Sequence, residues 1–235
     1  MRCKTIAIIP ARGGSKRIPK KNIKQFLGIP MIERTIQTLL NGNLFERIIV
    51  STDDEEIAQV AKNAGAEVPF LRDAGLADDH TPTAPVIREV IDKYYQKFGL
   101  EFDFCCCVYP CNPLLDNTLL ERARSWLAER EVDFVFPVCK YPHPIQRSMY
   151  MAANGKMSFR YPEFELTRTQ DLEDLYHDAG QFYFGKVSAW LAGRKMHTDG
   201  VGIVVPMHKV IDIDTLEDWK QAELLFKTIE TGKVE

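Results

Sequence analysis

The densest group of residues that can do chemistry lies in residues 10–22, which read PARGGSKRIPKKN. Gly13 and Gly14 let backbone N–H groups turn toward one point and form an anion-binding nest. The planar guanidinium group of Arg12 can donate two hydrogen bonds to phosphate oxygens, and Lys21 adds a compact positive charge. These residue types in this spacing predict an anion-binding loop at the end of a strand, which is called the phosphate loop below.

The charge around this phosphate loop also indicates an anionic ligand. Eight Lys or Arg residues precede the first acidic residue, Glu33, although the chain of 235 residues carries a net charge of -3. A solvated basic face is the alternative, but a plain surface does not need glycines between its charges. The mildly acidic chain does not suggest a nucleic-acid partner. The loop lacks both the Walker A ending and the Gly-x-Gly-x-x-Gly fingerprint, which argues against a P-loop kinase and an NAD enzyme.

Two acidic residues, Asp212 and Asp214, form an Asp-x-Asp pair near the other end of the chain. If the backbone there is extended, the spacing of two places both carboxylates on one side. Two neighbouring carboxylates repel each other, and a bound Mg²⁺ would relieve the repulsion. The alternative is that Asp214 only caps the last helix.

The cysteines and histidines offer weaker signals. Of six cysteines, four lie in residues 105–111. Neighbouring residues of a strand point to opposite faces, so this cluster cannot easily form a metal cage, and reduced cysteines in a buried strand are expected. His177 and Asp178 are adjacent, and adjacent residues rarely face each other. A structural pair is therefore expected in preference to a catalytic dyad.

The rest of the sequence must position these groups, and it alternates between apolar strands and amphipathic helices. Strands are expected at residues 4–10, 47–51, 67–71, 102–109, 133–138, 181–184 and 202–205. Helices are expected at residues 31–40, from 53 to the glycine at 65, and at 86–98, 119–130 and 215–229. Such alternation predicts a single three-layer α/β/α domain with a mostly parallel, Rossmann-like sheet. Ligands of such sheets bind beyond the carboxyl ends of the strands, where the phosphate loop begins.

Residues 139–179 break this pattern and are expected to form an insertion, with a hairpin at residues 148–157 around Asn154-Gly155. An irregular insertion in a regular α/β fold often forms a lid or an oligomerisation arm. The sequence shows no signal peptide and no apolar run of membrane-spanning length. A cytoplasmic protein without a membrane partner is therefore expected.

Five runs of residues together resemble a known family. They are the phosphate loop, STDDEEIA from Ser51, TRTQDL from Thr167, HDAGQFY from His177 and IDIDT from Ile211. The chain resembles, over nearly its whole length, the nonulosonic acid cytidylyltransferases, which are similar to CMP-sialic acid synthetases. The runs TRTQDL and HDAGQFY look most like the branch that acts on pseudaminic acid. The resemblance also implies a nucleotidyltransferase sheet and a homodimer in which residues 139–179 help to close the partner's site.

The resemblance assigns roles to individual residues. It implies that CTP is bound by Arg12, Gly13, Gly14, Ser15, Lys21, Asn22, Arg72, Asp79 and Thr83. For Arg72, a surface arginine that caps a strand end is the alternative. The resemblance further implies that Asp212 and Asp214 hold Mg²⁺, and that catalysis depends on Arg12, Lys21 and Asp214. One departure is Tyr109-Pro110, where some relatives carry a polar or acidic residue, so a ligand contact from this position is in doubt.

The implied reaction is attack by the anomeric hydroxyl of pseudaminic acid on the α-phosphorus of CTP, which yields CMP-pseudaminic acid and pyrophosphate. Positioning and charge neutralisation would drive it without a covalent intermediate. Because the sugar is a carboxylic acid, its pocket should contain a cation. The candidates for sugar binding are Gln146, Arg147, Arg168, Gln170, Gln181 and Tyr183. The alternatives are the same reaction on an N-acylneuraminate, a legionaminate or Kdo, or a regulatory nucleotide-binding protein without turnover.

Overall fold

The computed structural model describes residues 3–78 and 81–232. Seven strands within these residues form one sheet in the order β11-β6-β10-β5-β1-β4, with β9 paired to β6. The strands are β1 (Thr5–Pro10), β4 (Arg47–Ser51), β5 (Phe104–Val108), β6 (Phe134–Lys140), β9 (Tyr176–Asp178), β10 (Phe182–Lys186) and β11 (Gly200–Val204). Apart from residues 67–71, the strands and helices expected from the sequence are present, with boundaries within three residues.

The sheet is mostly parallel but contains a reversed strand near its centre. Strand β1 pairs in parallel with β4 and β5, and β11 pairs in parallel with β6. Strand β10 lies antiparallel between β5 and β6, and its first residue, Phe182, pairs with Val108 at the end of β5. The residues that precede β10 therefore lie at the same edge as the carboxyl ends of β1 and β5.

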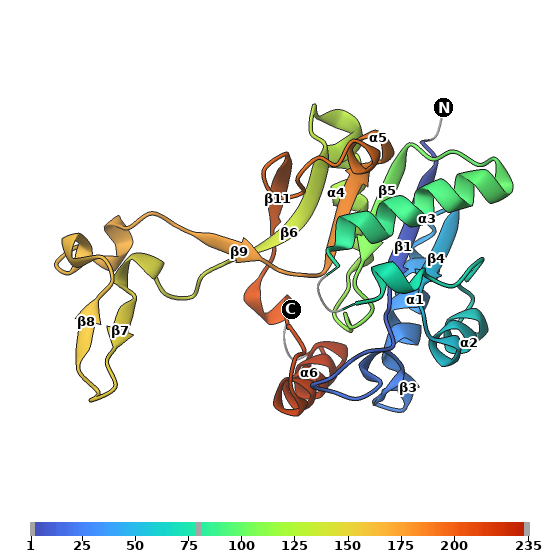
Figure 1. Cartoon of the computed structure of the whole chain (residues 1–235). Coiled ribbons are helices and arrows are strands. Elements are labelled where there is room, and N and C mark those ends of the chain that lie inside the picture. Colours follow the sequence, from blue (N-terminus) through green and yellow to red (C-terminus); the bar gives the residue numbers. More distant parts are fainter. Residues whose placement is uncertain (1–2, 79–80, 233–235) are drawn as a thin grey trace.

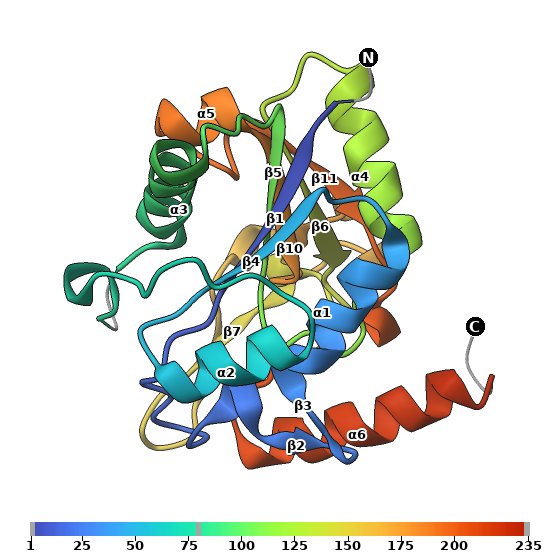
Figure 2. The same cartoon turned by 90° about the vertical axis from the view of Figure 1, so that its right-hand side faces the viewer.

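Helices cover both faces of the sheet, which confirms the three-layer prediction (Figure 2). One face packs against α1 (Met31–Gly42), α2 (Glu55–Asn63) and α4 (Asn117–Glu129). The other packs against α3 (Thr83–Phe98) and α5 (Val187–Leu191). Strand β5 divides its cysteines between the layers, because Cys106 faces the first core and Cys105 and Cys107 face the second. All three thiols are free and buried, as expected.

The last helix, α6 (Leu216–Glu230), packs beneath the phosphate loop, outside the two layers that cover the sheet (Figure 1). Trp219 meets Phe26 edge-on at 5.6 Å, where Phe26 belongs to the short hairpin of β2 (Gln25–Phe26) and β3 (Ile29–Pro30). Ile18 and Ile213 are buried in the same cluster. The helix thereby fixes the segment that carries the Asp-x-Asp pair next to the loop.

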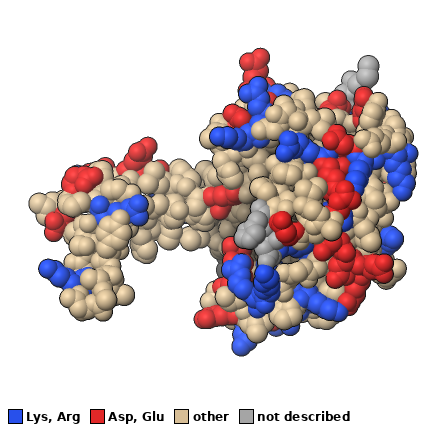
Figure 3. All heavy atoms as spheres, viewed as in Figure 1, with Lys and Arg blue, Asp and Glu red and all other residues tan. Residues whose placement is uncertain are grey.

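The insertion forms an arm that extends away from the body (Figure 1). It contains the expected hairpin, made of β7 (Met149–Met151) and β8 (Met157–Phe159). Three 3-10 turns accompany the hairpin, η3 (Ile145–Arg147), η4 (Pro162–Phe164) and η5 (Thr169–Asp171). The chain enters the arm after β6 and returns to the body through β9. Much of the arm surface in Figure 3 is uncharged. Two apolar residues of the arm, Met151 and Leu166, are 74% and 94% exposed.

One expectation and one alternative from the sequence are wrong. Residues 67–71 form no strand, because pairing with β4 stops after a single bridge between Ile49 and Glu67, and Pro69 has no N–H to extend the ladder. The cap of α6 is Thr215, whose side chain accepts from the Asp218 N–H in a capping box. Asp214 therefore does not cap the last helix.

Within residues 3–78 and 81–232, no helix is both long and apolar enough to cross a membrane.

Gly185 in β10 is predicted to tolerate no side chain, which gives a test of the packing behind the site. A Cβ there would lie 2.5 Å from the Phe134 ring and 2.8 Å from the Trp190 indole nitrogen. Overpacking of this kind costs about 1–3 kcal/mol, so Gly185→Ala should lower the free energy of unfolding by about that amount in urea denaturation. Gly75→Ala, whose added Cβ would meet nothing within 4 Å, is the control and should change stability by less than about 0.5 kcal/mol. Equal effects of the two changes would contradict the packing described.

Candidate functional site

A pocket of about 240 Å³ opens at the carboxyl ends of β1 and β5. Its walls come from the phosphate loop, the turn after β5, the turn before β10 and the segment before α6. These segments contribute Arg12, Ser15, Arg17, Lys21, Asn22, Tyr109, Cys111, Gly180, Gln181, Asp212 and Asp214. The structure thus brings together seven of the residues singled out in the sequence, namely Arg12, Ser15, Lys21, Asn22, Gln181, Asp212 and Asp214.

Asn22 holds the phosphate loop in its folded path. Its side chain is buried, and its amide donates to the Arg12 carbonyl at 2.9 Å. The thiol of Cys111, in the turn after β5, lies 3.3 Å from the Asn22 side-chain oxygen. Burial raises the pKa of Cys111 to about 12, so this thiol stays protonated and can donate. Asn22 therefore ties the end of the loop to its beginning and to the turn after β5, and Lys21 begins η1 (Lys21–Ile23).

The two glycines of the loop differ in what they do. The Gly13 N–H donates to the Asp53 carboxylate at 3.0 Å, and a Cβ on Gly13 would lie 2.8 Å from an Asp54 oxygen. A Cβ on Gly14 would meet nothing within 4 Å. Neither glycine lines the pocket. The prediction of an anion nest is therefore wrong at Gly13. Glycine at this position permits close approach of the segment after β4, and the Gly13 N–H already has a carboxylate partner.

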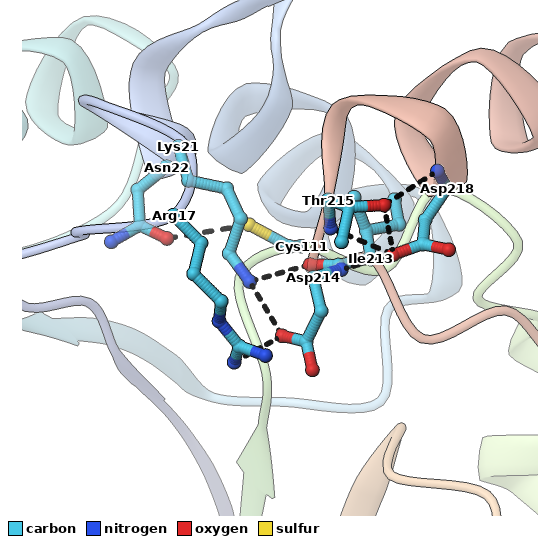
Figure 4. Close-up of polar contacts among 8 residues, drawn as sticks. All are labelled: Arg17, Lys21, Asn22, Cys111, Ile213, Asp214, Thr215 and Asp218. Atoms are coloured by element: carbon cyan, nitrogen blue, oxygen red, sulfur yellow. Dashed lines mark hydrogen bonds and ion pairs between the residues drawn. The ribbon is translucent and has the colours of Figure 1, made fainter.

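The cationic loop and the Asp-x-Asp pair both line the pocket, and Figure 4 shows Arg17 and Lys21 of the loop directed toward Asp214 of the pair. Arg17 donates to the Asp214 carboxylate at 2.6 Å. Lys21 donates to the Ile213 carbonyl at 2.7 Å and lies 3.8 Å from the same Asp214 oxygen. The Arg17 side chain is 67% exposed, and exposed ion pairs contribute only about 0–1 kcal/mol. An incoming polyanion can therefore displace this contact at little cost.

Asp212 has less compensation for its charge than Asp214. Burial, followed by the neighbouring Asp214 charge, raises the pKa of Asp212, while Lys21 and Arg17 oppose the shift. A cation bound between the two carboxylates would remove that repulsion.

The Asp-x-Asp pair fits a Mg²⁺ site that is completed by substrate. No group of three or more His, Cys, Asp or Glu side chains in residues 3–78 and 81–232 could hold a metal by itself. Mg²⁺ commonly takes only one or two carboxylates and completes its shell with phosphate oxygens and water. Asp212 and Asp214 supply two carboxylates next to a cationic loop, so this set of donors is suitable for Mg²⁺ that is bound together with a nucleotide.

Tyr109 and Gln181 form another wall of the pocket. The Gln181 amide donates to the Lys209 carbonyl at 2.7 Å, in the turn η6 (Met207–Lys209), so its orientation is fixed. The Tyr109 hydroxyl lies 2.9 Å from the Thr83 hydroxyl, and burial raises the pKa of Tyr109 to about 12. Thr83 therefore reaches the pocket only through Tyr109. The tyrosine itself lines the pocket at the position where the sequence left a contact in doubt.

Arg72 is buried and caps the end of β4 from inside. It is 7% exposed, and its guanidinium donates to the Ser51 hydroxyl at 3.0 Å and also to the Ser51 carbonyl. Burial lowers its pKa. The alternative of a surface arginine is therefore wrong, and Arg72 does not line the pocket. Asp79 lies outside the described residues.

The residues expected to bind sugar are divided between two places. Gln181 and Tyr183 lie in the body. Gln146, Arg147, Arg168 and Gln170 lie in the arm, and none of these four lines the pocket of the same chain. The Arg168 guanidinium is held by Asp171 through two contacts of 2.7 and 3.1 Å. A single chain therefore does not assemble the sugar site that the sequence predicts.

Sequence reasoning missed three pocket residues that matter for the geometry: Arg17, Tyr109 and Gly180. Arg17 was visible as part of the basic run, but the sequence cannot show that it reaches Asp214. Gly180 has a backbone φ of 62°, a conformation that favours glycine, and it belongs to the HDAGQFY run. His177 contacts the backbone carbonyl of Asp178 at 2.9 Å and not its carboxylate, so the two do not form a dyad.

Comparison with known proteins identifies relatives over nearly the full length of the chain. Residues 6–199 match the protein family described as Cytidylyltransferase. A pseudaminic acid cytidylyltransferase of Campylobacter jejuni is 40% identical over 225 residues, which cover 95% of this chain and 97% of that protein. A CMP-N,N'-diacetyllegionaminic acid synthase of Legionella pneumophila is 31% identical and covers 94% of this chain and 96% of that protein.

A solved structure shares the fold at low sequence identity. It is a CMP:2-keto-3-deoxy-manno-octonic acid synthetase complexed with CTP, with a TM-score of 0.70 and 15% identity. The match covers 96% of this chain and 99% of that one. At this identity the likeness supports the α/β architecture and not a shared substrate.

The two aspartates around α6 should affect stability with opposite signs. The raised pKa of Asp212 means that its ionised form is disfavoured in the folded state, so a penalty appears as pH rises from the unfolded pKa of about 3.9 through the folded value. Hydrogen bonds from Thr215 lower the pKa of Asp218, so its contribution is favourable above about pH 3.9 and is lost as pH falls through its folded pKa. Without divalent metal at pH 7.5, Asp212→Asn should raise Tm by about 1–2 °C, and Asp218→Asn should lower it.

Both differences should shrink as the pH is lowered toward about 3.5. The measurement is thermal unfolding followed by circular dichroism in EDTA over this pH range. A lower Tm for Asp212→Asn at pH 7.5 would contradict the charge balance described for the pocket.

Proposed function

This chain belongs to the cytidylyltransferase family, and we propose that it transfers CMP from CTP to the anomeric hydroxyl of pseudaminic acid and releases pyrophosphate. The observation that carries the proposal is the 40% identity to pseudaminic acid cytidylyltransferases over 95% of the chain. The pocket supports it, because a cationic loop faces a carboxylate pair across a space that can take phosphates.

In the proposed reaction, the pocket residues bind the phosphates of CTP and neutralise negative charge. Arg12 and Lys21 bind the phosphates of CTP and stabilise the negative charge of the departing pyrophosphate. Lys21 is held in place by the Ile213 carbonyl, so its ammonium group needs little reorganisation when CTP binds. Arg17 exchanges its contact with Asp214 for a phosphate oxygen, which frees the carboxylate. Mg²⁺, held by Asp212 and Asp214, supplies charge neutralisation at the α-phosphate when it is bound.

The sugar acid enters beside Tyr109 and Gln181, and its carboxylate needs a cation that this wall does not show. Arg147 and Arg168 are candidate cations, but they lie in the arm. We therefore propose that the arm of a second copy closes the pocket and brings one of these arginines to the sugar. The exposed apolar side chains of the arm support a buried contact with such a partner. They include Met149, Tyr150, Met151 and Leu166.

The proposed reaction is tested by pyrophosphate release with CTP, Mg²⁺ and a panel of nonulosonic acids. Pseudaminic acid should give the highest kcat/KM, followed by legionaminic and neuraminic acids. Asp214→Asn should reduce kcat by about 10²–10³-fold, because it removes a carboxylate from the reacting centre. Lys21→Ala should raise KM for CTP more than KM for the sugar acid.

Each contrary outcome overturns a different part of the proposal. Pyrophosphate release with a legionaminate or a neuraminate, but not with pseudaminate, would show that the sugar substrate is not pseudaminic acid. The 31% identity to the Legionella synthase makes legionaminate the first alternative. CTP binding without release for any acid would favour a regulatory nucleotide-binding protein. Unchanged activity of Asp214→Asn would remove Asp214 from the metal site.

The role of the arm is tested by mixing two inactive variants. Asp214→Asn damages the body, and Arg147→Ala or Arg168→Ala, whichever abolishes turnover, damages the arm. If each site combines the body of one copy with the arm of the other, half of the subunit pairs after mixing carry one intact site. About one quarter of the wild-type activity should then return. If the arm serves its own chain, mixing should restore nothing beyond the sum of the two variants.

A further inference from the structure

Asp178 lies at the base of the arm and connects three separate segments. It is the last residue of β9, the strand that returns from the arm to the body. One of its carboxylate oxygens accepts the Gly180 N–H at 2.8 Å. The other accepts the Tyr183 hydroxyl of β10 and lies 2.8 Å from Nε2 of His197, in the loop between α5 and β11. Asp178 is therefore a junction between the arm, the sheet and that loop.

Aromatic packing continues this junction to the pocket. The Tyr183 ring is buried and meets the ring of Tyr109, which lines the pocket, edge-on at 5.9 Å. The His197 ring packs edge-on against Phe136 at 5.2 Å and against Tyr183 at 5.6 Å. His197 is 55% exposed, yet two aromatic rings and a carboxylate fix its position. A continuous path of contacts thus runs from the surface at His197 to the pocket wall at Tyr109.

The path ends on the side of the pocket that lies away from the phosphate loop. In the sheet, β10 is separated from β1 by β5, so the start of β10 lies roughly 10 Å to the side of the loop. In an in-line displacement the nucleophile attacks opposite the leaving group. With pyrophosphate held by the loop, the sugar acid lies nearer to Tyr109, Gly180 and Gln181. The junction at Asp178 therefore supports the sugar side of the pocket.

The direction of the hydrogen bonds decides which groups this wall can recognise. Burial and the hydrogen bond to Asp178 raise the pKa of Tyr183, so the phenol keeps its proton and donates it to Asp178. The Gly180 N–H is also directed to Asp178. Both donors are thus directed to Asp178 and not to the pocket, and the Gln181 amide nitrogen is likewise occupied by the Lys209 carbonyl. The side-chain oxygen of Gln181 can still accept a hydrogen bond from an O–H or N–H group of a sugar that carries hydroxyl and acylamino substituents.

We propose that His197 and Asp178 form a positioning pair that fixes Tyr183, Tyr109 and the Gly180 turn for binding of the sugar acid. The inference rests on the proposed function, because it concerns the sugar side of the same pocket. His197 takes the role that the adjacent His177 cannot fill, since His177 contacts only the backbone carbonyl of Asp178. Through β9, the pair also links the arm to the wall that contacts the sugar.

The pair is tested by steady-state kinetics of His197→Ala and His197→Gln in the full-length enzyme. His197→Ala should raise KM for the preferred sugar acid about tenfold, while KM for CTP and kcat change by less than about threefold. His197→Gln keeps an N–H donor and should recover most of the loss. An unchanged KM for the sugar in His197→Ala would overturn the proposal, as would an equal rise in KM for CTP.

Arg194→Ala is the matched control, because Arg194 lies in the same loop and is 61% exposed. Its guanidinium lies 3.7 Å from Asp133, and no contact links it to Asp178. It should leave both KM values unchanged. If Arg194→Ala raises KM for the sugar as much as His197→Ala does, the effect comes from disruption of the loop, and the positioning role is overturned.

A measurement without sugar separates this proposal from the proposed function. The urea midpoints of His197→Ala, Asp178→Asn and the double variant form a double-mutant cycle. The double variant should lose clearly less than the sum of the single losses. Additive losses would overturn the pair, even if the enzyme makes CMP-pseudaminate. Coupling together with no pyrophosphate release from any sugar acid would instead refute the proposed function.

Discussion

The pocket depends on the apolar cluster that packs α6 against the phosphate loop, because this cluster brings the cations of the loop to the Asp-x-Asp pair. Arg17 and Asp214 are 197 positions apart, yet they are in contact at 2.6 Å. The contact requires α6 to pack beneath the loop, where Trp219 and Phe26 meet in a small apolar cluster. Because an exposed ion pair is weak, burial of that cluster, and not the ion pair, keeps the charges together.

The reversed strand β10 explains how one pocket can serve two substrates. Parallel strands β1 and β5 direct the loop and Tyr109 to a common edge. If β10 were also parallel, the residues before it would lie at the opposite edge of the sheet. Its antiparallel direction brings Gly180 and Gln181 to the pocket and places the base of the arm beside them. The wall formed by the loop and the wall formed by Gly180 and Gln181 are thus held by different strands of one sheet.

The sequence predicted those parts of the structure that depend on local patterns. Apolar runs identified the strands, and the basic glycine-containing run identified the loop, because both signals lie within a few residues. It failed where tertiary contacts decide the outcome. Pro69 ended a pairing that the apolar pattern favoured. The partners of Arg17, Arg72 and Asp178 come from distant segments, which no spacing in the sequence can reveal.

The arm carries candidate sugar-binding residues away from the pocket of its own chain, and the proposed second copy would supply them to that pocket. Arg147 and Arg168 would serve a carboxylate substrate, but the chain carries them away from its own pocket. An arm that exposes 74% of Met151 and 94% of Leu166 gains stability only when another surface covers it. If that surface is the pocket of a second copy, the contact that buries the apolar arm also completes the sugar site. Asp178, at the base of the arm, is then placed to transmit the position of the arm to the pocket wall.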